Sequence, residues 1–137
     1  MNPVTVTSFP DKTGRPFLDD LARLRIAVFA EWPYLYEGTL EYEQHYLRKF
    51  FKTKGSILVL ARDGQRVVGA STGLPLLRES AALKRPFVQA GYDLRRIFYF
   101  SESILLPEYR GRGIGVRFFE HREAWARADV ALRGSRF

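Results

Sequence analysis

The chain has 137 residues, no cysteine, and 46% hydrophobic and 15% aromatic residues, which suit one folded domain with a single core. Without cysteine it forms no disulfide and uses no thiol catalysis, and with only two histidines we expect no metal centre. The formal net charge is +7, which favours an anionic partner such as a polyphosphate, a nucleic acid or a membrane surface. No stretch of about 18 apolar residues and no signal-peptide pattern is present, so we expect a cytoplasmic protein that does not enter a membrane.

The first half of the chain predicts a strand followed by two helices. Residues 4–9 alternate weakly between apolar and polar side chains, and turn residues close this strand. From Pro16, an apolar stripe at helical spacing predicts a helix that Pro33 ends. Thr39 is placed to cap a second helix, which runs out at Gly55.

The second half predicts a hairpin, a short helix and a long strand. Residues 56–62 and 67–73 are strand-like and flank the turn residues 63–66, which is the clearest hairpin signal in the chain. A short helix is expected around residues 80–90. Residues 97–106 are rich in aromatic and β-branched side chains and predict another strand.

A basic, glycine-rich segment follows this last strand. Pro107 cannot donate a ladder hydrogen bond, so the strand ends there. Residues 110–115 read Arg-Gly-Arg-Gly-Ile-Gly, and apolar residues at helical spacing then predict a helix from Gly115 towards the end of the chain. The free N–H groups and the positive dipole end of such a helix start attract anions. The segment therefore predicts an anion-binding site.

The spacing of the glycines narrows the choice of anion. A Walker loop needs a lysine after its glycines, and none follows here. A Rossmann fingerprint is spaced G-x-G-x-x-G, whereas Gly111, Gly113 and Gly115 give G-x-G-x-G. The form that fits is R/Q-x-x-G-x-G/A, with Arg110 in the first place. Because a strand ending Leu-Leu-Pro-Glu-Tyr precedes it and an amphipathic helix follows, the segment resembles motif A of the GNAT acetyltransferase superfamily.

The resemblance implies both a fold and a cofactor. The family fold is α/β (α+β), with a mixed, mostly antiparallel sheet flanked by helices, and we expect residues 1–137 to form one such domain. In the family the loop grips the pyrophosphate of acetyl-coenzyme A (acetyl-CoA), while the strand before it pairs through its backbone with the pantetheine arm. The residues implied here in binding CoA are Ile104, Leu105, Leu106, Arg110, Gly111, Arg112, Gly113, Ile114, Gly115 and Arg117.

The chain also departs from the family pattern. The family fold normally continues after the motif A helix with further strands and another helix, whereas this sequence stops at Phe137. We therefore expect a domain shortened at its C-terminus, with an open edge on the strand at 97–106. Because proteins rarely leave such an edge uncovered, a homodimer is one expected cover.

Glu102 is the candidate catalytic base. It is the one carboxylate in an otherwise apolar strand, where a charged group is costly unless it is paired or titrates unusually, and the family often uses a glutamate on this strand. The family takes its general acid, a tyrosine, from the part that is missing here. The candidates that remain are Tyr34, Tyr36, Tyr99 and Tyr109.

The candidate substrate-binding residues lie in the acidic and aromatic loop between the first two helices. They are Glu31, Trp32, Tyr34 and Tyr36, with Glu37 beside them. Carboxylates and aromatic ring faces both attract cations, so this loop suits an amine in its cationic form. Packing of the same rings against the sheet is the competing interpretation.

Taken together, these features predict an N-acetyltransferase that moves an acetyl group from acetyl-CoA to a primary amine of an unknown acceptor, in a direct ternary complex. One alternative is a domain that binds CoA without catalysis or depends on a partner. A less favoured alternative is a basic nucleic-acid-binding domain with Phe98, Tyr99 and Phe100 as stacking platforms. Residues 31–44, with four glutamates and no lysine or arginine, argue against it.

Overall fold

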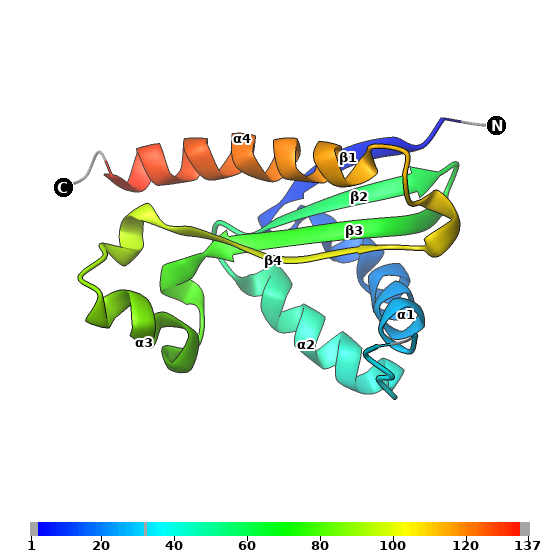
Figure 1. The fold of residues 1–137 in the computed structure, drawn as a ribbon, viewed down its shortest axis with the longest axis horizontal. Helices are drawn as coiled ribbons and strands as arrows, with labels where there is room; N and C mark the ends of the chain where they lie inside the picture. The colour runs from blue at the N-terminus through cyan, green and yellow to red at the C-terminus, as the bar shows by residue number, and fades with distance from the viewer. Residues whose placement is uncertain (1–2, 32, 135–137) are drawn as a thin grey trace.

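The computed structural model, which describes residues 3–31 and 33–134, contains a four-stranded sheet with helices on both faces (Figure 1). The strands are β1 (Thr5–Pro10), β2 (Ile57–Asp63), β3 (Arg66–Pro75) and β4 (Phe98–Leu105), and they pair in chain order. The helices are α1 (Leu18–Phe29), α2 (Leu40–Lys52), α3 (Ala81–Gln89) and α4 (Ile114–Gly134). Every pairing among these strands is antiparallel, which confirms the predicted α+β class.

Local caps and turns, of which the Thr39 cap was predicted, explain where several elements begin. The Thr39 hydroxyl accepts a hydrogen bond from the Tyr42 amide at 3.2 Å, as predicted for the start of α2. Ser80 caps α3 in the same way, through the Leu83 amide at 3.3 Å. In the turn between β2 and β3, Gly64 has a φ of 61°, a conformation that favours glycine.

The first helix begins later than the sequence predicts. Residues Asp11–Phe17, which include Pro16, form a 3-10 turn, and α1 starts only at Leu18. The buried Gly14 of this turn packs closely against α2, since an added Cβ would lie 2.8 Å from the Phe51 ring. The turn is also tied to the end of α2, since the Gly55 amide donates to the Asp11 carboxylate at 2.5 Å.

Each face of the sheet carries its own apolar core. Leu58 and Leu60 of β2 pack beneath α1 and α2, whereas Ile57, Val59 and Ala61 pack beneath α4, and all five are fully buried. In Figure 1, α4 runs along one face of the sheet, while α1 and α2 lie on the other. β2 is therefore a central strand that carries both cores, and its run of apolar residues follows from this position.

Strand β4 forms one edge of the sheet and pairs only with β3 among the described residues. A register shift opposite Thr72 and Gly73 leaves Ser101 as an extra residue, which is a β-bulge. Phe100 faces α4, where its ring centroid lies 5.4 Å from that of Phe119. Beyond the bulge, Ile104 packs into the core beneath α1 and α2, and Glu102 faces the same side.

Candidate active site

The glycine-rich loop leaves open space in front of its backbone. Gly111 and Gly113 both have a φ of 78°, which strongly favours glycine. A Cβ added at Gly111, Gly113 or Gly115 would meet no heavy atom within 4 Å. Helix α4 starts at Ile114, so the amide groups of residues 114–116 have no partner within the helix, whereas the Arg117 amide donates to the Gly113 carbonyl at 3.2 Å. The loop therefore leaves room for an anion in front of its backbone, and binding of a polyphosphate there stays a prediction.

The three arginines predicted to hold the cofactor are placed differently. Arg110 Nε donates to the Leu105 carbonyl at 3.1 Å, which brings its charge back to the end of β4. Arg112 donates to the Glu108 carbonyl at 2.9 Å and lies over the Tyr109 ring. Arg117 donates to the carbonyl of Val4, just before β1, at 3.2 Å. In this arrangement Arg110 and Arg112 stay beside the loop, while Arg117 contacts the segment before the opposite edge strand.

The backbone of β4 divides its polar groups between β3 and the open edge. The Leu106 amide donates to the Val68 carbonyl at 2.9 Å, so Leu106 faces β3. Since antiparallel pairs alternate, Ile104 also faces β3, whereas Ser103 and Leu105 turn their N–H and C=O groups to the open edge. Of residues 104–106, which were predicted to pair with pantetheine, only Leu105 therefore turns its backbone groups to the open edge. Its carbonyl already accepts a hydrogen bond from Arg110.

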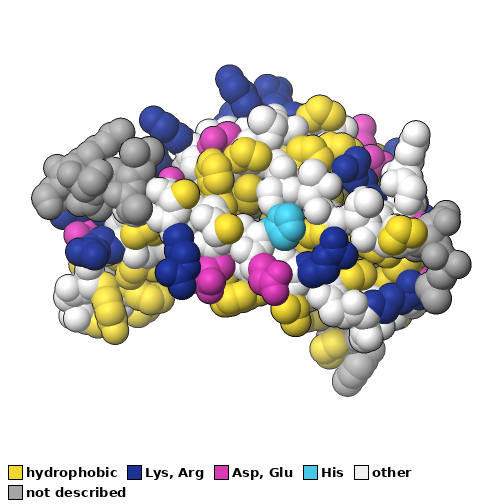
Figure 2. All heavy atoms as spheres, turned by 90° about the horizontal axis from the view of Figure 1, so that it is seen from above, with side chains coloured by type: hydrophobic (Ala, Val, Ile, Leu, Met, Phe, Trp, Pro, Cys, Tyr) yellow, Lys and Arg dark blue, Asp and Glu magenta, His cyan; other side chains and the backbone are white. Residues whose placement is uncertain are grey.

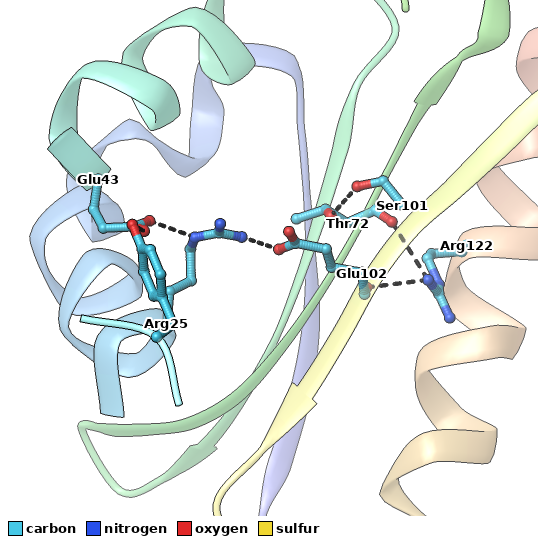
Figure 3. Close-up of polar contacts among 7 residues, drawn as sticks. Arg25, Glu43, Thr72, Ser101, Glu102 and Arg122 are labelled. Atoms are coloured by element: carbon cyan, nitrogen blue, oxygen red, sulfur yellow. Dashed lines mark hydrogen bonds and ion pairs between the residues drawn. The ribbon is translucent and has the colours of Figure 1, made fainter. Parts of the chain in front are cut away.

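Glu102 belongs to a hydrogen-bonded cluster of three charged side chains and one tyrosine, whose polar contacts are drawn in Figure 3. Arg25 of α1 donates through Nη1 to Glu102 Oε2 and through Nε to Glu43 Oε2 of α2, the latter at 2.5 Å. The Tyr36 hydroxyl donates to the other oxygen of Glu43 at 2.9 Å. We call these four residues the Arg25 cluster. Glu43 has no exposed surface, and the side chain of Glu102 is 26% exposed.

The pKa values of Arg25, Tyr36 and the adjacent Tyr46 are all raised. Burial acts to lower the pKa of Arg25, but hydrogen bonds and attraction to Glu102 and Glu43 outweigh it, so the pKa is raised. Burial and the bond to Glu43 raise the pKa of the Tyr36 hydroxyl. Burial and the charge of Glu102 likewise raise the pKa of Tyr46, whose ring lies 4.7 Å from the Arg25 guanidinium carbon. Arg25 therefore remains a cation and Tyr36 a neutral donor.

A pocket of about 330 Å³ adjoins this cluster. Its walls come from Arg25, Phe29, Tyr34, Tyr36 and Tyr42, and we call it the tyrosine pocket. The ring centroids of Phe29 and Tyr34 lie 5.3 Å apart in an edge-on contact, and the side chain of Tyr34 is largely exposed. The pocket thus brings together two of the predicted substrate-binding residues, and a guanidinium forms part of its wall.

The other predicted substrate-binding residues lie outside this pocket. Glu31 and Glu37 are exposed and do not line it, and the prediction for Trp32 lies outside the described residues. Glu43, which is buried, is instead bonded to two residues of the wall, Tyr36 and Arg25. The carboxylates bonded to wall residues therefore come from α2 and, through Arg25, from β4, and not from the loop.

The four tyrosines proposed as general acids differ in their hydroxyl partners. Tyr109 donates to Asp63 at the end of β2 at 2.6 Å, and this bond raises the pKa of Tyr109. Tyr36 donates to Glu43. Neither Tyr34 nor Tyr99 has a hydroxyl hydrogen bond to any other described residue, so these two keep a hydroxyl for a ligand.

A second arginine approaches β4 from the opposite face. Arg122 of α4 donates through Nη1 to the carbonyls of Thr72 at 3.3 Å and Glu102 at 3.2 Å. Its guanidinium carbon lies 4.6 Å from the Phe100 ring centroid, and burial lowers the pKa of Arg122. Beside it, the hydroxyls of Thr72 and Ser101 lie 2.8 Å apart across the bulge (Figure 3). Arg122 therefore fastens the backbone of the strand that carries Glu102.

Sequence reasoning missed Arg25, Glu43 and Arg122 as parts of the site. A signal was present, because Arg25 follows Leu24 on the buried stripe of α1, and Glu43 lies between Leu40 and Leu47 on that of α2. Opposite charges on the apolar stripes of successive helices indicate a buried ion pair. Whether those two helices pack side by side is a tertiary property, so the pair could not be assigned.

Two negative findings apply to the described part of the chain. Among residues 3–31 and 33–134, no helix combines the length and apolar character needed to span a membrane. Over the same residues, His, Asp and Glu side chains form no group of three that could hold a metal ion.

On the face that carries α4, Lys and Arg side chains are interspersed with acidic and apolar ones rather than gathered in one patch (Figure 2).

The open-edged strand β4, the glycine-rich loop and helix α4 follow one another in the order described for motif A. The chain matches the model of the Acetyltransferase (GNAT) family over residues 21–134. It therefore belongs to the GNAT family, which is a family of acyltransferases, and the predicted resemblance is confirmed. A comparison with curated proteins finds no match.

Solved structures with a similar fold are also acetyltransferases. The aminoglycoside N-acetyltransferase AAC(6')-Iy in complex with CoA has a TM-score of 0.66 and 12% identity, over 93% of this chain and 72% of that one. The aminoglycoside 6'-N-acetyltransferase AAC(6')-Ih from Acinetobacter baumannii gives 0.63 and 17%, over 92% and 73%. The ribosomal-protein-alanine N-acetyltransferase from Brucella melitensis biovar Abortus 2308 gives 0.57 and 16%, over 93% and 74%. At these identities the similarity shows the shared fold.

Proposed function

We propose that this chain transfers an acetyl group from acetyl-CoA directly to a primary amine, with both substrates bound at once. The observation that carries the proposal is that Glu102 lies on the open-edged strand β4 and that the glycine-rich loop follows the same strand. Glu102 lies three residues before Leu105, about 10 Å along β4, and the loop follows the end of the same strand. An acyl donor lying along this edge would therefore reach from the loop towards Glu102.

The residues proposed to bind CoA act mainly through backbone groups. The amides of residues 111–115 would hold the pyrophosphate, with charge from Arg110 and Arg112 beside them. Arg117 is also predicted to contact CoA, and to do so its side chain must break its hydrogen bond to the Val4 carbonyl. Of residues 104–106, Leu105 has the edge-facing groups suited to pantetheine. When bound, acetyl-CoA supplies the acetyl thioester.

The proposed role of Glu102 is to accept a proton from the acceptor. A primary amine is mostly protonated at neutral pH and must lose a proton before its lone pair can attack a carbonyl. Glu102 Oε1 is the atom suited to take that proton, directly or through a water molecule, because Oε2 is bonded to Arg25. The leaving thiolate needs a proton in turn, and Tyr34 and Tyr99 are the candidates whose hydroxyls stay free of other described residues.

The tyrosine pocket is the proposed acceptor site. Its rings present apolar faces and hydroxyls, which suit a polar molecule that also carries a cation. Aminoglycosides and peptides with an N-terminal alanine are the first acceptors to test, because the structural neighbours are named for them. The proposal places this reaction in the cytoplasm, as the sequence predicts.

A second candidate function is CoA binding that needs a partner for turnover. The open edge of β4 favours it, because an unpaired strand edge invites another strand. A second copy of the chain is the proposed partner. Activity that rises more steeply than protein concentration would favour this candidate.

The first experiment measures the melting temperature with and without coenzyme A at millimolar concentration. A ligand at about 100 times its dissociation constant stabilises a protein by about 2.7 kcal/mol, so a clear increase is expected. Inorganic pyrophosphate is the matched control for simple anion binding. No increase with coenzyme A would contradict both candidate functions.

The second experiment follows thiol release from acetyl-CoA with a panel of aminoglycosides, polyamines and peptides. Removing a general base lowers turnover by about 100-fold or more, so we expect that loss in Glu102→Gln. The stabilisation by coenzyme A should stay as in the unchanged chain. Loss of both properties would show that Glu102 holds the fold of the site rather than accepting a proton.

A further inference from the structure

The two oxygens of the Glu102 carboxylate have different surroundings. Oε2 accepts a hydrogen bond from Arg25, whereas Oε1 has no partner among the described residues. The Arg25 side chain is 11% exposed and that of Glu102 is 26% exposed, so the carboxylate is anchored on its buried side and open on the other. One oxygen is thus fixed and one is left for a ligand.

Arg25 is itself held from several sides. Glu43 accepts from its Nε at 2.5 Å, the Tyr46 ring centroid lies 4.7 Å from its guanidinium carbon, and the Phe29 ring lies at 5.3 Å. A planar guanidinium between two carboxylates and two rings has little freedom to rotate. Arg25 therefore holds the Glu102 carboxylate in one orientation.

Glu43 also balances the charge of Arg25. The three ionised groups sum to a single negative charge, so Glu102 is anchored by a cation without being neutralised by it. If Glu43 were neutral, the full attraction of Arg25 would fall on Glu102. That carboxylate would then hold a proton less readily and attract an acceptor cation less strongly.

We propose that Arg25 is a positioning residue for the proton-accepting Glu102, and that buried Glu43 sets both the direction and the charge balance of Arg25. This inference rests on the proposed acetyl transfer. Tyr36 extends the effect to the acceptor site, because it donates to Glu43 and lines the tyrosine pocket. The groups that interact with Glu102 directly are Arg25, Tyr46 and, on its backbone side, Arg122, while Glu43 and Tyr36 lie behind Arg25.

The test compares Glu43→Gln with Glu41→Gln, which removes the same charge from an exposed position on the same helix. In Glu43→Gln we expect kcat to fall about tenfold and the acidic limb of the pH profile of kcat/KM to move down by about one pH unit, the size of a neighbouring-charge effect. KM for the acceptor should change less than about threefold. Glu41→Gln should match the unchanged chain.

A double variant is expected to shift the acidic limb of the pH profile in the opposite direction. In Arg25→Gln/Glu43→Gln both buried charges are gone, so Glu102 loses its cation and the acidic limb should move to higher pH. A purely structural role would lower activity in both variants without shifting the two profiles in opposite directions. Coenzyme A stabilisation, measured in each variant, verifies that the domain is folded.

The outcomes separate this inference from the proposed function. Profiles of Glu43→Gln and the double variant that match Glu41→Gln, in an active enzyme, overturn the positioning role and leave acetyl transfer intact. Release of no thiol by the unchanged chain with any amine overturns the proposed function itself. Shifts of opposite sign support the positioning role.

Discussion

Two arginines approach strand β4 from opposite faces of the sheet, and they bind it in different ways. Arg25 of α1 contacts the Glu102 side chain and pairs with a second carboxylate, Glu43. Arg122 of α4 contacts the Glu102 carbonyl and pairs with a second carbonyl, that of Thr72. Despite its burial the pKa of Arg25 is raised, whereas burial lowers the pKa of Arg122.

The difference shows how one strand can be held rigid and still carry a reactive group. Carbonyl oxygens bear only partial charges, so Arg122 supports the backbone at the bulge without forming an ion pair. Carboxylates bear full charges, so Arg25 forms two ion pairs, one with Glu43 and one with the side chain of Glu102. The α4 face thus supports the backbone of the strand, and the α1 and α2 face holds its carboxylate.

The variant with the largest expected effect is Arg25→Met, which tests the ion pair on the α1 and α2 face. It leaves Glu43 buried without its cation, and removing one partner of a buried ion pair costs about 3–5 kcal/mol. We expect a loss of that size in the free energy of unfolding, measured with urea. Arg25→Met/Glu43→Gln should recover part of it, and a loss below about 1 kcal/mol in the single variant would contradict a structural ion pair.

The next prediction concerns the glycine-rich loop. Gly113→Ala places a side chain at a φ of 78°, and Gly64→Ala places one at 61° in the hairpin. Both should destabilise the domain by about 1–2 kcal/mol, the cost of a left-handed non-glycine residue. Calorimetric titration should show about tenfold weaker binding of coenzyme A in Gly113→Ala only. Equal affinity for coenzyme A in the two variants would show that the cofactor does not bind at this loop.

Arg122→Met tests the other face. It removes two hydrogen bonds to carbonyls and leaves no unpaired carboxylate behind, so a loss of about 1 kcal/mol is expected in the urea experiment. This variant should be clearly more stable than Arg25→Met. A loss as large as that of Arg25→Met would mean that the two faces do not differ in the way described.

The smallest expected effect is a pH dependence at Tyr36. Its pKa is raised in the folded state, so its bond to Glu43 contributes stability below about pH 10 that is lost as the pH rises through the raised value. Tyr36→Phe should therefore flatten the alkaline decline of the melting temperature. Tyr92→Phe, at an exposed tyrosine, is the control and should leave the decline unchanged.

Local sequence was sufficient to predict most elements and the loop. Thr39 and Ser80 act within one turn of the helices they cap, and Gly113 governs its own φ, so their effects do not depend on distant residues. The 3-10 turn before α1 was not predicted, and its Gly14 packs against Phe51 from a segment far along the chain. For the candidate site, neighbouring residues were enough to single out Glu102, whereas Arg25 and Glu43 were not predicted, and the roles of the site residues stay predictions.

By itself the sequence determined the class of domain, the glycine loop and Glu102 as the carboxylate of an apolar strand, because each is a property of neighbouring residues. The tertiary structure decided what surrounds that carboxylate. Arg25 is 77 residues from Glu102 in the chain and 18 from Glu43, and only the packing of α1 against α2 and β4 brings the three together. A buried charge requires a partner, but which partner it finds is set by the contacts between helices and sheet.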